Sequence, residues 1–154
     1  MPDDDPVVTK VRKTAVLHSG VVDNRDHRTV GDSASKEYTF YDKGFADKLR
    51  KERYGEKLAD LFTKNHLVTR QTSIAWYKST FPADMRTAKV EMDTTIEFVA
   101  ADPGYLEASK FALDTPYTQH RTLSLARSGD TWTIVAIQKG PLTPQEQAPL
   151  KPGS

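Results

Sequence analysis

The chain contains no cysteine, which excludes disulfide bonds, thiolate metal ligands and cysteine nucleophiles. It also lacks an apolar run of the roughly 18 residues that a membrane-spanning helix needs. An excess of one charge is missing as well. Because 22 basic and 21 acidic residues leave a formal net charge of +1, no overall field attracts nucleic acid or an anionic membrane. Any binding must therefore depend on local features of the surface.

Motifs for cofactors and catalysis are missing too. The sequence has no GxGxxG or GxxxxGK[ST] phosphate loop, no GxSxG nucleophile elbow and no HExxH zinc motif. Its histidines lie far apart, with no pair on consecutive helical turns: His18, His27, His66 and His120. We therefore expect no cofactor and no metal site, and the sequence disfavours nucleophilic hydrolysis.

The length of 154 residues fits one domain, which we expect in residues 33–139. Residues 1–32 predict a flexible or extended N-terminal arm, in which the β-branched run 7–22 forms at most a short strand. Residues 140–154 hold several prolines and predict a disordered proline-rich tail. Acidic first residues and such a tail are typical of a segment taken from a longer protein, so a leader or membrane anchor outside the chain stays open.

Helical spacing begins near Ser33. Apolar residues recur every three or four positions, which predicts a helix that breaks near Gly44 and ends near Tyr54-Gly55, with glycine in the left-handed closing position. A second short helix follows and ends before Asn65. The inward residues of the two segments are Tyr38, Tyr41, Phe45, Leu49, Leu58, Leu61 and Phe62.

Strand patterns dominate the second half. The run RTAKVEMDTTIEFVA, residues 86–100, alternates apolar and charged positions and predicts a long strand with one buried face. Residues 117–127 and 131–138 predict a hairpin closed by Ser128-Gly129-Asp130. Residues 67–80 predict another strand, and 105–113 favour a strand or irregular structure because prolines flank them. Together these elements predict an α+β fold, with N-terminal helices packed on a curved antiparallel sheet of about four strands.

This order of elements, with the closing hairpin RTLSLARSGDTWTIVAIQKG, resembles the nuclear-transport-factor-2-like superfamily over roughly residues 33–139. The resemblance implies a cone-like bent sheet wrapped around a helix, and it implies no single function. The layout is also similar to the extracytoplasmic assembly-factor domains of type IV secretion systems. That similarity implies a docking role in the periplasm or cell envelope, with a cytoplasmic location still open.

The stretch FADKLRKERYGEKLADLF, residues 45–62, is the most densely charged part of the chain. Its cations alternate with anions, which is typical of a solvated helix face, and i,i+4 pairs such as Asp47 with Lys51 are expected there. Since stacking aromatics are scarce among them, we expect no nucleic-acid binding. A protein partner, or a second copy of the chain, could instead contact Lys48, Lys51 and Arg53.

Large aromatic residues have two interpretations. They are either parts of the core or the walls of a ligand pocket between sheet and helices, and core is the more common role at this spacing. The residues concerned are Tyr38, Tyr41, Trp76 and Trp132.

Two residues are candidates for acid–base catalysis, Asp93 and His120. By strand alternation both lie on the faces opposite to the apolar side chains, so they point away from any hollow unless a bulge shifts the register. The sequence thus favours a non-catalytic interaction or assembly domain, the soluble part of an anchored or secreted protein. The alternative is a small cofactor-free isomerase, dehydratase or ligand carrier. Membrane contact is expected only through a segment outside the chain.

Overall fold

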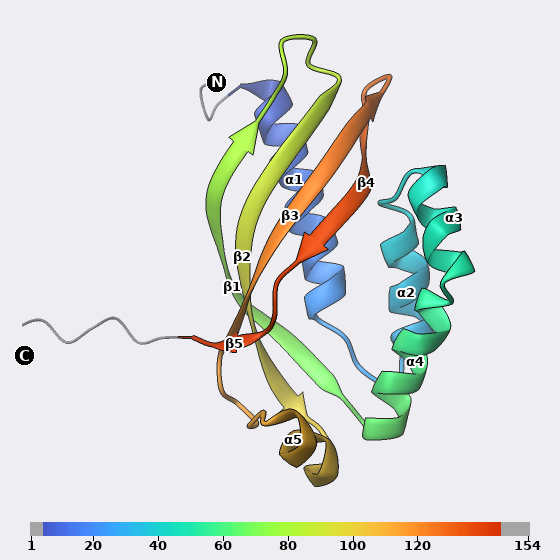
Figure 1. Ribbon diagram of the computed structural model, residues 1–154, viewed down its shortest axis with the longest axis vertical. Coiled ribbons are helices and arrows are strands. Elements are labelled where there is room, and N and C mark those ends of the chain that lie inside the picture. Colours follow the sequence, from blue (N-terminus) through green and yellow to red (C-terminus); the bar gives the residue numbers. More distant parts are fainter. Residues whose placement is uncertain (1–4, 146–154) are drawn as a thin grey trace, which may run out of the picture.

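The computed structural model describes residues 5–145 and confirms the α+β class, with helices on a five-stranded antiparallel sheet (Figure 1). The helices are α1 (Pro6–Asp23), α2 (Val30–Tyr38), α3 (Lys43–Lys51), α4 (Tyr54–Asn65) and α5 (Pro103–Ser109). The strands are β1 (Val68–Thr80), β2 (Thr87–Ala100), β3 (Tyr117–Ser128), β4 (Thr131–Lys139) and β5 (Thr143–Pro144). Within residues 5–145, no helix has both the length and the apolar character needed to cross a bilayer.

The strands follow one another in the order β1-β2-β3-β4, and β5 adds to β3. Figure 1 shows α1 running along one side of the sheet, α2–α4 grouped beyond it, and α5 near the far end of β2. The predicted strands in residues 67–80, 86–100, 117–127 and 131–138 are confirmed. The hairpin turn is confirmed as well, because Gly129 takes a φ of 61°, a left-handed conformation that glycine adopts without strain.

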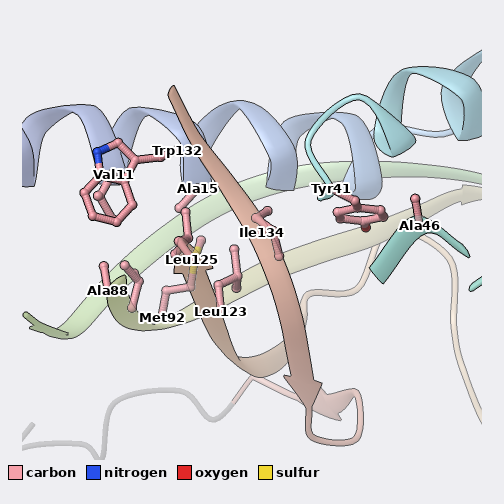
Figure 2. Close-up of a cluster of buried hydrophobic side chains, with 11 residues drawn as sticks. Val11, Ala15, Tyr41, Ala46, Ala88, Met92, Leu123, Leu125, Trp132 and Ile134 are labelled. Carbon is pink, nitrogen blue, oxygen red and sulfur yellow. The ribbon is translucent and has the colours of Figure 1, made fainter. Parts of the chain in front are cut away.

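The alternation in β2 decides which face of the sheet is buried. Side chains from Ala88 to Phe98 at every second position are buried against the helices, and we call this the inner face of the sheet. Leu123, Leu125 and Ile134 continue it across β3 and β4, while Val11 and Ala15 cover it from α1 (Figure 2). Full burial of one such branched side chain contributes about 1.5–3 kcal/mol, so this cluster supplies much of the stability.

The expectation of a short strand or extended arm in residues 7–22 is wrong. Asp5 caps helix α1 by accepting a hydrogen bond from the Val7 backbone nitrogen at 2.8 Å, and Pro6 occupies the first turn. Val8, Val11 and Ala15 then face the sheet at helical spacing. The valines have high strand propensity, but burial of this apolar stripe outweighs it.

The predicted helix break lies at residues 39–42, slightly before Gly44. Asp42 caps α3 through the Phe45 backbone nitrogen at 2.8 Å. The break has a second role: the Ile134 nitrogen donates to the Phe40 carbonyl at 2.8 Å, so this segment covers the outer edge of β4. The expected left-handed glycine is wrong, since Arg53 adopts that conformation and Gly55 lies inside α4.

Two further expectations change. Of residues 105–113, for which a strand or irregular structure is expected, residues 105–109 belong to helix α5, which begins at Pro103. In the expected tail, residues 143 and 144 pair with β3 as strand β5. Residues 1–4 of the expected arm and 146–154 of the expected tail lie outside the described residues. The division of the chain into an arm, a domain at 33–139 and a tail stays a prediction.

Candidate functional site

A pocket of about 210 Å³ lies between α4 and the inner face of the sheet, and we call it the inner pocket. It exists because α4 packs mainly against α2 and α3 and leaves a space above the strands. Its apolar walls come from Leu58 and Phe62 on α4 and from Ile96 and Phe98 on β2. Its polar end comes from Asp23, Arg25, Gln119, Arg121 and Lys139.

Two buried ion pairs close the polar end. Arg121 donates to Asp23 through two nitrogens, at 2.5 Å and 3.3 Å, and both side chains are almost fully buried. Arg25 pairs with Glu37, and these side chains are only 1% and 3% exposed. Buried charges need such partners because an unpaired ion costs several kcal/mol in this environment. The pairs therefore tie the C-terminal end of α1 to β3 and to α2.

Glu37 also organises two tyrosines and a histidine. Tyr41 and Tyr54 both donate their hydroxyl hydrogen bonds to the Glu37 carboxylate. Burial, and then the Glu37 charge, raise the pKa of both phenols. Because the Tyr41 proton points to Glu37, its oxygen accepts from Nε2–H of His18 at 2.9 Å. Burial and the Arg121 charge lower the pKa of His18 to about 3, so the imidazole stays neutral.

The aromatic candidates lie in or beside the core. Tyr41 and Trp132 belong to the buried cluster of the inner face, and Tyr38 and Trp76 pack against it (Figure 2 labels Tyr41 and Trp132). Trp132 meets Phe81 edge to face, with ring centroids 6.4 Å apart. None of the four lines the inner pocket. A role for them in binding a ligand or partner stays a prediction.

The charged stretch at residues 45–62 forms the exposed side of α3 and α4. Asp47 pairs with Lys43 at 2.7 Å and with Arg50 at 3.4 Å, so the expected pair with Lys51 is wrong. Arg53 pairs with Glu56 at 2.5 Å. Lys48 and Lys51 are exposed, and their role as partner contacts also stays a prediction.

Asp93 and His120 come together on the outer face of the sheet. The β2–β3 register runs without a shift from Thr87 opposite Ala126 to Ile96 opposite Tyr117, so no bulge between them turns these residues inward. Asp93 accepts from the Tyr77 hydroxyl at 2.8 Å and lies 2.7 Å from Nδ1 of His120. Tyr77 and Asp93 also line a wide concave surface of about 740 Å³ on this face. Both hydrogen bonds of the cluster are exposed to solvent, whereas an acid–base enzyme encloses its site.

A second concave surface lies outside, between α1 and α2, and we call it the α1 groove. Its volume is about 630 Å³, and its lining includes Val16, Leu17, Gly20, Val21 and Phe40. Val16 is 41% exposed and Leu17 is 51% exposed, although both are apolar residues in a well-formed helix. Neighbouring exposed apolar side chains of this kind mark contact surfaces more often than scattered ones do.

Sequence reasoning missed the polar network and the α1 groove. Asp23 and the α1 residues of the groove fall in residues 1–32, the segment expected to be an arm. A signal for Arg121 was present: it shares strand parity with Leu123 and Leu125, so a charged side chain falls on an apolar face. Such a residue needs a buried counter-ion, and its partner Asp23 lies 98 positions away in the sequence.

Solved structures share this fold. An IcmL-like type IV secretion system protein from Legionella pneumophila matches with a TM-score of 0.63 at 12% identity, covering 94% of this chain and 98% of that chain. The periplasmic domain of DotI matches with a TM-score of 0.63 at 14% identity, covering 92% and 97%. A periplasmic fragment of TraM gives 0.49 at 9% identity, covering 85% and 95%.

No family model matches the chain, and no curated protein sequence matches it. At such low identity the structural likeness shows a shared fold. The expected similarity to domains of type IV secretion systems is therefore confirmed at the level of the fold. The resemblance to the nuclear-transport-factor-2-like superfamily stays a prediction.

Proposed function

We propose that this chain is a non-catalytic protein-interaction domain that works in an assembly of the type IV secretion kind, outside the cytoplasm. The shared fold supports it, since the two better-matching structures are a secretion-system protein and a periplasmic domain, each matched over nearly its whole chain. The outward, solvent-open position of Asp93 and His120 points the same way. The α1 groove carries the proposal, because it exposes apolar side chains that a folded monomer would normally bury.

The groove suits docking onto a second copy of the chain. A two-fold interface uses the same patch on both partners, so a ridge and a hollow must lie side by side. Leu17 supplies the ridge, and Gly20 one turn later opens the hollow, where an added Cβ would meet no atom within 4 Å. Leu17 of each copy can then enter the hollow of the other. A net charge of +1 opposes this contact only weakly.

Sedimentation velocity over a concentration series tests this contact. Wild type should dimerise, and Leu17→Asp should weaken dimerisation at least tenfold, because a carboxylate would be buried in an apolar contact. Leu113→Asp is the matched control, since Leu113 is also an exposed leucine, at 41%, on a different surface. Equal loss in both variants, or a wild type that stays monomeric at its highest soluble concentration, would contradict the proposal.

Filling the hollow gives a second test that adds no charge. Gly20→Leu should weaken dimerisation by occupying the space into which Leu17 docks. Gly31→Leu is its control, because Gly31 is also a helical glycine with open space around its Cα. Circular dichroism should show the same helix content for both variants, which separates a lost contact from a lost fold.

A further inference from the structure

The inner pocket holds an uncompensated positive charge. Three cations lie at its polar end: Arg25, Arg121 and Lys139. Only two carboxylates form ion pairs with them, Glu37 with Arg25 and Asp23 with Arg121. The carboxylates are already occupied. Asp23 accepts from Arg121 and from Gln71, and Glu37 accepts from Arg25 and two tyrosines. Among the described residues, Lys139 forms no ion pair. Its positive charge is therefore not compensated, whereas the charges of the two arginines are.

The register of β3 and β4 places two of these cations opposite each other, which destabilises the fold. Lys139 on β4 lies directly opposite Arg121 on β3, and both line the same pocket. Like charges facing each other across neighbouring strands are destabilising unless something neutralises them. Desolvation and then the Arg121 charge lower the pKa of Lys139, and the charges of Glu37 and Asp23 oppose this shift without reversing it. An anion beside Lys139 would relieve this repulsion.

The rest of the pocket is apolar. Leu58 and Phe62 on α4 and Ile96 and Phe98 on β2 line a space that side chains leave open. The volume of about 210 Å³ corresponds to roughly seven water molecules. Water gains little from such walls, whereas an apolar chain or ring would be favourably buried there. A ligand that fits this pocket should therefore have one anionic end and one apolar end.

We propose that the inner pocket binds a small amphipathic monoanion, a carboxylate with a medium-length apolar chain, with its carboxylate beside Lys139 and its chain between α4 and β2. Lys139 lines the pocket and part of its side chain is exposed to solvent, so the ligand can reach it without unfolding the domain. Within residues 5–145, the inner pocket shares no lining residue with the α1 groove. Binding in the inner pocket can therefore be tested independently of docking onto a second copy.

Titration of the ¹⁵N-labelled chain with octanoate tests the site. Saturable shifts should appear at backbone amides around Leu58, Phe98 and Lys139, and octanoate should raise the melting temperature because it binds the folded state. Lys139→Gln should weaken the affinity about tenfold. Lys89→Gln, on the outward parity of β2, is the matched control and should bind octanoate like wild type.

Three ligands with the same octyl chain and different head groups separate the contribution of charge from that of apolar burial. Octylammonium should bind far more weakly than octanoate, and 1-octanol should have an intermediate affinity, because only the carboxylate can form an ion pair with Lys139. Lys139→Gln should also make the unliganded protein slightly more stable, since it removes the like charge opposite Arg121. Absence of saturation, or equal affinity of wild type and Lys139→Gln for octanoate, or equal binding of octylammonium, would overturn the proposal.

Discussion

Asp23, the last residue of α1, and Arg121, in the middle of β3, form a buried two-pronged ion pair with nitrogen–oxygen distances of 2.5 Å and 3.3 Å. The contact joins two segments 98 positions apart. Arg121 also donates to Gln119 at 2.9 Å, and Asp23 also accepts from Gln71 at 2.8 Å. The pair therefore fixes where the first helix ends over the inner face of the sheet.

Removing one partner of this pair should be strongly destabilising. Asp23→Ala leaves the Arg121 charge buried without its counter-ion, and the free energy of unfolding should fall by about 3–5 kcal/mol. Urea denaturation followed by circular dichroism measures the change. Asp26→Ala is the control, because it breaks an ion pair with Arg28 whose guanidinium side chain is 74% exposed, and its effect should be much smaller.

Replacement of the whole pair distinguishes charge from packing. Asp23→Leu combined with Arg121→Met removes both charges and keeps similar volume, so its stability should return close to that of wild type. If the double variant is as unstable as Asp23→Ala, the pair acts through packing and polar neighbours, and the explanation by an uncompensated charge is wrong.

Stability should fall in mild acid because of His18. The folded protein keeps this imidazole neutral down to a pKa of about 3, whereas the unfolded chain takes up the proton near the ordinary value of 6.5. Between these values the unfolded chain binds more protons, so the contribution is complete above pH 6.5 and is lost as the pH falls. The slope from this group approaches about 1.4 kcal/mol per pH unit.

Urea denaturation between pH 5 and 7 measures this slope, and His18→Gln should flatten it. The variant can be less stable overall, since only the dependence on pH carries the test. An NMR titration gives an independent check: the His18 ring signals should not move between pH 5 and 8. A ring that titrates near pH 6.5 would contradict its burial as a neutral group.

The sheet was predictable because its pattern is local. Alternation from Ala88 to Phe98 marks a half-buried strand by itself, and Gly129 supplies the turn conformation that closes the hairpin. Helix α1 was not predictable in the same way. Its valines have the composition of a strand, and its helical stripe becomes decisive only when the sheet is present to cover it.

The candidate sites depended still more on distant contacts. The position of Asp93 and His120 on the outward side followed from strand parity alone, and it agrees with the structure. The inner pocket arises because α4 packs on α2 and α3, a relation between helices that no local pattern records. The repulsion between Lys139 and Arg121 follows from the strand register, which the sequence alone does not give. Parity could have identified Arg121 as a buried cation, but not its partner.

Substitutions on the two faces of β3 should have unequal costs. Leu123→Ala opens a cavity in the buried cluster, so the free energy of unfolding should fall by about 2–5 kcal/mol. Thr122→Ala changes the neighbouring position on the outer face, and its effect should stay below about 1 kcal/mol. Both are measured by urea denaturation. Similar losses for the two variants would contradict the assignment of inner and outer faces.

Tyr77 reports on the outer-face cluster. Its hydroxyl donates to Asp93, and this hydrogen bond together with the carboxylate charge raises the pKa of the phenol above its ordinary value of 10.0. Asp93→Asn should therefore lower the pKa of Tyr77, followed by ¹³C NMR of labelled tyrosine from pH 8 to 12. Glu97→Gln is the control, because it removes another outer-face carboxylate of β2 that does not touch Tyr77. If Asp93→Asn leaves the titration unchanged, or Glu97→Gln shifts it equally, the cluster is not held by the Tyr77–Asp93 bond.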